Sequence, residues 1–173
     1  MLEALQLRTL VIGNSGSGKS RLAEGLGALI QAPVFDLDLI HWKDMGLELS
    51  KTRMWLGRRL PTWLRRSVGS SKAWYGWLAE VAVPRATALI WLDLSWQVCR
   101  DGLLARGQRR GGTEAAFSEL LKWAEAYWDR QTPTSFEGHQ RLFEGFSAAK
   151  LRIRARKEAD RLLTDLTVHT DQN

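Results

Sequence analysis

Apolar residues follow two spacings along the chain, and these spacings predict alternating strands and helices. Short, nearly continuous apolar runs predict buried strands over residues 7–12, 34–37, 88–94 and 150–154. Apolar positions three or four residues apart predict helices over residues 19–31, 96–106 and 157–166, and one more after Thr113. Such alternation is typical of an α/β fold with helices on both faces of a mostly parallel sheet. At 173 residues, we expect one domain over residues 1–173.

Polar residues mark where two of these helices begin. Ser95 and Thr113 precede helical patterns as N-caps, because their side-chain oxygens can accept backbone N–H groups of the first turn. The helix after Thr113 has one apolar stripe, formed by Phe117, Leu120, Leu121, Ala124 and Trp128. Turn-forming residues then predict an irregular stretch through Pro133, Ser135 and Gly138.

A complete phosphate-binding motif lies between the first predicted strand and the first predicted helix. The pattern G-x-x-x-x-G-K-[ST] is matched by Gly13, Asn14, Ser15, Gly16, Ser17, Gly18, Lys19 and Ser20. Glycines let the backbone turn its N–H groups toward phosphate oxygens, and the helix that follows adds its positive dipole end. We expect Lys19 to reach the β- and γ-phosphates and Ser20 to hold magnesium. The motif therefore predicts binding of a nucleoside triphosphate with Mg²⁺, without distinguishing ATP from GTP.

Two carboxylates follow the second predicted strand. Asp36 and Asp38 should emerge at the same sheet edge as the phosphate loop, where ligands gather in open α/β sheets. One carboxylate can hold magnesium through water, and the other can accept a proton from an acceptor hydroxyl. The alternative is a solvated turn, in which aspartate is common.

The chain resembles a known group of enzymes in the sequences VIGNSGSGKS, VFDLDLIHW and YGWLAEVAVPRATALIWLDL and in the basic stretch after them. These resemble the small P-loop kinases of the adenylate kinase, shikimate kinase and gluconate kinase group, most closely the bacterial adenylate-kinase-like topology modulation proteins. The resemblance implies a three-layer P-loop NTPase sandwich that transfers the γ-phosphoryl of ATP to a small-molecule or nucleotide acceptor. It also implies that Asp38 lies beside the acceptor and Asp36 on the magnesium side.

The resemblance assigns roles to several arginines as well. Residues 106–112 resemble a short lid, in which Arg106, Arg109 and Arg110 would close over the transferring phosphates. A solvated basic loop between two helices is the alternative. Arg156 falls where related kinases place residues against the adenine.

The formal charge of +6 is concentrated in one segment. Residues 45–73 contain seven of the 25 basic residues and one of the 19 acidic residues, so the remaining eighteen of each sign balance. The resemblance implies an acidic helix and a third strand in this place. The chain has MGLELSKTRMWLGRRLPTWLRRSVGSSKA instead, and we find no convincing buried strand before Trp74.

A displaced reading frame can explain this segment. Joining the third base of each codon to the first two bases of the next allows the translation GLGAIEDEDVARTTVADVAAKERWIVEGV, which supplies both the acidic helix and the strand. We hypothesise that compensating insertion and deletion shifted the frame over about residues 44–74. Because the chain as written lacks the implied strand and its Glu-Gly element, ATP binding is better supported than turnover, and the protein could be a kinase inactivated by this segment. The alternative is a basic amphipathic insert that binds nucleic acid, membrane or an acidic acceptor. The protein would then be an ATP-binding regulator or a nucleic-acid-associated ATPase.

Composition limits the setting of the protein. The first thirteen residues lack a leader pattern, no apolar run has the length of a membrane span, and Cys99 has no second cysteine for a disulfide. We therefore expect a cytoplasmic protein with no membrane partner. The sequence predicts neither the acceptor nor the oligomeric state.

Overall fold

Five parallel strands form one sheet in the computed structural model, which describes residues 8–32, 34–36, 69–72, 83–108 and 112–170. The order across the sheet is β2-β3-β1-β4-β5. The strands are β1 (Arg8–Gly13), β2 (Val34–Asp36), β3 (Gly69–Lys72), β4 (Ala88–Leu92) and β5 (Ala149–Ile153). The parallel sheet predicted from the sequence is confirmed.

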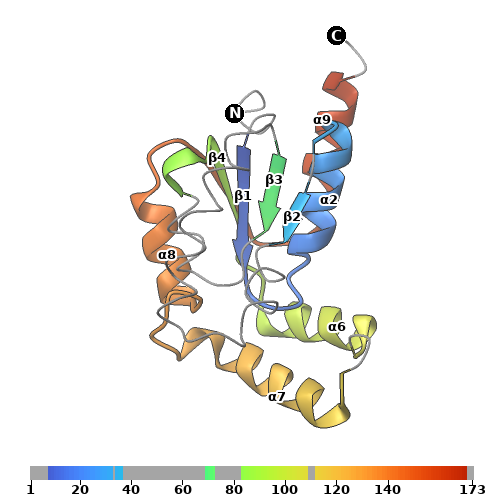
Figure 1. Cartoon of the computed structure of the whole chain (residues 1–173), viewed down its shortest axis with the longest axis vertical. Coiled ribbons are helices and arrows are strands. Elements are labelled where there is room, and N and C mark those ends of the chain that lie inside the picture. Colours follow the sequence, from blue (N-terminus) through green and yellow to red (C-terminus); the bar gives the residue numbers. More distant parts are fainter. Residues whose placement is uncertain (1–7, 33, 37–68, 73–82, 109–111, 171–173) are drawn as a thin grey trace, which may run out of the picture.

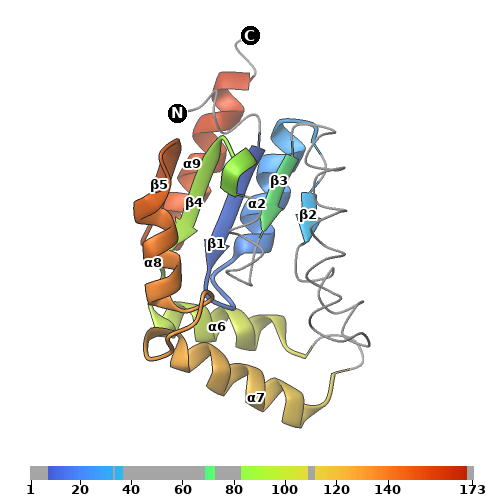
Figure 2. The same ribbon diagram turned by 60° about the vertical axis from the view of Figure 1, so that its left-hand side comes forward.

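Helices cover the sheet and its carboxyl edge (Figures 1 and 2). The helices are α2 (Lys19–Leu29), α6 (Trp96–Arg106), α7 (Glu114–Glu125), α8 (Phe136–Gly145) and α9 (Arg156–Thr170), with short turns η1 (Val83–Arg85) and η2 (Ala126–Trp128). Figure 2 shows α2 and α9 together behind the strands, α8 on the other side, and α6 and α7 beyond the strand ends. This is the predicted three-layer arrangement.

The neighbouring strands β1 and β4 contribute many of the buried core residues. A parallel strand covered on both faces needs apolar residues without alternation. Leu10, Val11 and Ile12 of β1 are at most 1% exposed, as are Ala88 to Trp91 of β4.

None of the helices that the structure describes is long and apolar enough to cross a membrane.

The third strand is a departure from our prediction. β3 pairs with β1 on one side and β2 on the other, so a strand does precede Trp74. Its sequence is Gly-Ser-Ser-Lys, without one apolar residue, although central parallel strands are normally apolar. The displaced frame reads Ile-Val-Glu-Gly across the codons of residues 69–73. The pairing partners, rather than the local sequence, therefore define this strand.

The predicted irregular stretch was partly wrong, because α8 begins within it. Ser135 caps the helix by accepting a hydrogen bond from Gly138 N (3.2 Å). Gly138 is helical, and it lacks a Cβ where the backbone at residues 132–133 comes close. The glycine serves packing against the preceding loop, and we had interpreted it as a turn signal.

The other helix boundaries largely follow the sequence patterns. Ser95 and Thr113 are N-caps as predicted, each accepting a hydrogen bond from the third residue beyond it. α9 extends to Thr170, four residues further than expected. Trp128 was wrongly assigned to the apolar stripe, since it lies in η2 and is 36% exposed.

Candidate phosphate-binding site

The phosphate-binding loop joins the carboxyl end of β1 to the first turn of α2. Gly13, Gly16 and Gly18 all have positive φ, at 146°, 75° and 94°. Gly18 stands at the N-cap of α2 in the left-handed conformation, which L-residues with a Cβ rarely adopt. Its carbonyl accepts the first helical hydrogen bond from Leu22 N (3.0 Å). The glycine spacing thus produces the turn that points the start of α2 at the loop.

Lys19 is held against this loop. Its Nζ donates to Gly13 O (3.0 Å) and Asn14 O (2.8 Å), and the residue is 8% exposed. The hydroxyls of Ser15 and Ser17 are buried and have no partner among the described residues. A triphosphate fits this chemistry, because its oxygens accept hydrogen bonds from hydroxyls, backbone amides and ammonium groups alike.

Arg156 links the phosphate-binding loop to α6 through hydrogen bonds. One guanidinium nitrogen donates to Gly16 O (3.0 Å) and to Val98 O (2.9 Å). Arg156 also borders a cavity of about 20 Å³ between the loop and α9, room for about one water molecule. That volume is much smaller than a purine base, so the implied contact with adenine stays a prediction.

Two glycines allow this close approach. A Cβ on Gly16 would collide with the backbone of Cys99, and a Cβ on Gly102 would collide with Gly16 O and the Arg156 guanidinium. Gly102 belongs to the site although no sequence motif marks it. The sequence could have indicated it only through the position of a glycine inside a predicted helix, because glycine lowers helix stability and usually occurs there where close packing excludes a Cβ.

Gly102→Ala is expected to lower the free energy of unfolding by about 1–2 kcal/mol. Overpacking typically costs about 1–3 kcal/mol, which outweighs the gain of up to about 1 kcal/mol in helix propensity. Denaturant titration measures the change. The matched control is Gly145→Ala, because a Cβ there meets nothing within 4 Å. If the Gly102→Ala variant is as stable as the parent, the space between Gly102, Gly16 O and the Arg156 guanidinium can accommodate a methyl group.

Asn14 links the phosphate-binding loop to α7 through a hydrogen bond. Its Nδ2 donates to Ala124 O (2.8 Å), and its Oδ1 accepts from Ser15 N (2.8 Å). Asn14 is 2% exposed, and Ala124 is fully buried in the last turn of α7. Both ends of the Asn14 carboxamide are therefore used within the protein, and only its backbone remains for a phosphate.

A buried polar network continues from η2. Trp91 Nε1 donates to Tyr127 Oη (3.4 Å), which lies 2.7 Å from His139 Nδ1. The indole N–H donates to the Tyr127 oxygen, and the direction of the bond between Tyr127 and Nδ1 depends on the tautomer of His139. Nε2 is buried and has no partner in the described part of the chain. Burial, with the charges of Lys19 and Arg130, lowers the pKa of His139 from 6.5 to about 3.

Acid is therefore expected to destabilise the protein through His139. The folded state holds the neutral imidazole, so stability is lost as pH falls from 6.5 toward 3, by at most about 1.4 kcal/mol per pH unit. His139→Asn keeps an acceptor near Tyr127 and removes the titration. Denaturant titrations at several pH values should show a flatter acid limb in the variant. If the free energy of unfolding falls equally steeply with acid in the parent and the variant, His139 is not the titrating group.

Asp93 is a residue of this edge that we did not predict. It follows β4 directly, and β4 pairs with β1 so that Leu92 lies opposite Gly13. Arg152 donates to its carboxylate through Nε (3.0 Å) and a terminal nitrogen (2.8 Å) and stacks over Trp91 at 4.2 Å. The side chain of Asp93 is 13% exposed. This ion pair joins β4 to β5 beside the loop.

The remaining predicted residues are scattered. Ser20 lies in the first turn of α2 and is exposed, and Arg106 is exposed at the end of α6. Asp36 ends β2, and β3 lies between β2 and β1, so the Asp36 backbone is about 10 Å from β1. Asp38, Arg109 and Arg110 lie outside the described residues.

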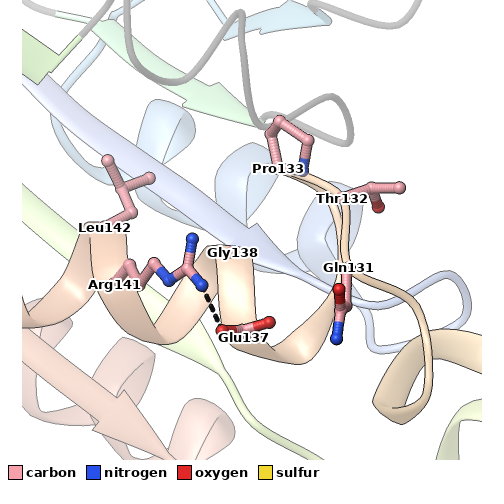
Figure 3. Close-up of a pocket in the computed structure, with 7 residues that line it drawn as sticks. All are labelled: Gln131, Thr132, Pro133, Glu137, Gly138, Arg141 and Leu142. Atoms are coloured by element: carbon pink, nitrogen blue, oxygen red, sulfur yellow. Dashed lines mark hydrogen bonds and ion pairs between the residues drawn. The ribbon is translucent and has the colours of Figure 1, made fainter.

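A cavity of about 470 Å³ lies beside α8 (Figure 3). Among the described residues it is lined by Gln131, Thr132, Pro133, Glu137, Gly138, Arg141 and Leu142. Arg141 and Glu137 form an ion pair one helical turn apart along this wall. The paired charges leave a polar but nearly neutral lining.

Solved structures share this architecture. No protein-family model matches the chain, and no curated protein matches it. A gluconokinase from Sinorhizobium meliloti 1021 is similar, with 15% identity, a TM-score of 0.55 and coverage of 97% of this chain and 93% of that one. An uncharacterized protein from Eubacterium ventriosum ATCC 27560 follows at 10% identity, a TM-score of 0.50 and coverage of 97% and 99%. A deoxyadenosine kinase from M. mycoides with bound dATP has 12% identity, a TM-score of 0.49 and coverage of 91% and 97%. At these identities the likeness concerns the fold alone, and the gluconokinase, with a TM-score above 0.5, shares the three-layer α/β sandwich of this chain.

Proposed function

We propose that the protein binds MgATP in the loop of residues 13–20 and transfers the γ-phosphoryl group to a small acceptor. One observation carries the proposal: a complete phosphate-binding motif has the turned glycine backbone and the inward lysine of such a loop, with the buried hydroxyls of Ser15 and Ser17 beside them. Backbone N–H groups and the α2 dipole favour the phosphates. Lys19 would offset the charge that develops on the transferring group.

Magnesium would supply charge neutralisation between the phosphates and these side chains. We propose that Ser20, in the first turn of α2, ligates it and that Asp36, at the end of β2, acts through a water molecule. The described residues hold no group of three or more metal-ligating side chains. This composition agrees with magnesium, which keeps several waters and phosphate oxygens as ligands.

The acceptor region is proposed to include the cavity beside α8. Its Glu137 and Gln131 can accept or share hydrogen bonds with hydroxyls, and Arg141 is already paired. We propose Asp38 as the group beside the acceptor hydroxyl, and Arg106, Arg109 and Arg110 as groups that stabilise the transferring phosphates. The finer likeness to adenylate-kinase-like topology modulation proteins remains part of this proposal.

One observation favours a second candidate, an ATP-binding protein without turnover. β3 is the direct neighbour of β1, and its Gly-Ser-Ser-Lys offers no carboxylate at the edge where the implied Glu-Gly element would stand. If the basic segment contacts nucleic acid, that binding should weaken steeply as salt rises. ATP binding in the loop would persist in both cases.

An ADP-release screen tests the proposed function. Nucleoside monophosphates and small alcohols or sugars would be offered with MgATP to this chain and to a chain with the displaced-frame segment restored. Acceptor-dependent ADP release by this chain supports the kinase, and release by the restored chain alone supports a kinase that the segment has inactivated. ATP binding without acceptor-dependent release by both chains supports the second candidate.

A further inference from the structure

The phosphate loop is connected to the cavity beside α8 by a short series of buried hydrogen bonds. The series uses three elements that follow each other in sequence: the end of α7, the turn η2 and the first half of α8. Each connection joins a buried side chain to a fixed partner, and each can be cut by a substitution that changes few atoms.

The first connection is the carboxamide of Asn14. The Nδ2 of Asn14 donates to Ala124 O, a carbonyl in the last turn of α7, at 2.8 Å. The same side chain accepts from Ser15 N, and the Asn14 carbonyl accepts from Lys19 Nζ. Any shift of the loop backbone on phosphate binding therefore acts on the end of α7.

The second connection is the hydroxyl of Tyr127, three residues further on. It bonds His139 Nδ1 at 2.7 Å, with both residues at most 1% exposed. His139 belongs to the same two turns of α8 as Glu137 and Arg141, which line the cavity. Tyr127 thus sets the position of α8 relative to the end of α7.

We propose that Asn14 and Tyr127 are positioning residues that couple the phosphate-binding loop to the wall of the cavity beside α8. The proposal rests on the proposed function only in that MgATP occupies the loop. Because coupling is reciprocal, a nucleotide that orders the loop also orders α8, and an acceptor that orders α8 strengthens nucleotide binding.

Hydrogen exchange with the full chain tests each connection separately. The probe is magnesium with the β,γ-imido analogue of ATP at saturation. In the parent chain, we expect the analogue to slow amide exchange about 5-fold or more in residues 13–29, 124–128 and 136–145. Asn14→Asp keeps the Ser15 bond and loses the donor to Ala124, but it adds a carboxylate to the loop, so its affinity for the analogue is measured first. At the variant's own saturation, the slowing in 124–128 and 136–145 should be lost. Tyr127→Phe should keep it in 13–29 and 124–128 and lose it in 136–145.

Controls separate the outcomes. Gln97→Ala removes an exposed carboxamide that bonds Asp101 on α6, and it should leave the parent pattern intact. If Asn14→Asp does not fold, Tyr127→Phe alone still tests the second connection. Slowing in 136–145 that survives in the variants, or that is absent from the parent while 13–29 is protected, overturns the coupling. No slowing anywhere overturns the proposed function instead.

Discussion

Lys19→Ala is expected to lower the rate of phosphoryl transfer by roughly 10²–10³-fold and to weaken MgATP binding. Removing one preorganised donor from a charge-developing site typically has an effect of that size. Lys19 is the one buried lysine or arginine among the residues that the structure describes, and its ammonium lies within the loop rather than in solvent. Isothermal titration calorimetry gives the binding constant, and ADP release gives the rate.

The matched control for this experiment is Lys122→Ala. Lys122 is an exposed lysine on α7 that pairs with Glu119, so its loss should leave nucleotide binding unchanged. Lys19→Ala also removes two hydrogen bonds to loop carbonyls, and circular dichroism should show that the variant is folded. A folded variant that binds MgATP as tightly as the parent would refute the loop as the nucleotide site.

Replacing residues 45–74 by GLGAIEDEDVARTTVADVAAKERWIVEGV should raise the free energy of unfolding by about 3–6 kcal/mol. The replacement places isoleucine and valine where β3 has Gly69 and Ser70, between β2 and β1. Burying one such side chain contributes about 1.5–3 kcal/mol. Denaturant titration of both chains measures the difference. The restored chain should also show any acceptor-dependent ADP release, because a glutamate returns to the end of β3.

A smaller change separates the strand from the rest of the segment. The double variant Gly69→Ile with Ser70→Val alters β3 alone, and it should recover part of the gain if the strand is buried. An unchanged or lower free energy of unfolding in the restored chain would count against the displaced frame. Sequencing the DNA across the codons of residues 44–74 and the intact peptide decides the origin of the segment directly.

The site illustrates how much local sequence can predict. The loop from Gly13 to Ser20 was recognisable because phosphate binding needs glycines, a lysine and a hydroxyl at fixed offsets. Gly102, Asp93 and Tyr127 were not recognisable in this way, because each acts through partners far away in the chain. Gly102 matters only because Gly16 and Arg156 lie against it, and Asp93 only because β5 brings Arg152 to β4.

The sequence by itself determined the parallel α/β class, the strands β1, β2, β4 and β5, the caps of α6 and α7, and the phosphate loop. These features depend on residues close together in the chain, whose spacing and backbone preferences are readable directly. Only the tertiary structure decided that Gly-Ser-Ser-Lys pairs as a strand, that Gly138 lies inside a helix, and that Asn14 joins the loop to α7. Hydrogen bonding to distant neighbours and close backbone packing override local preference at these positions.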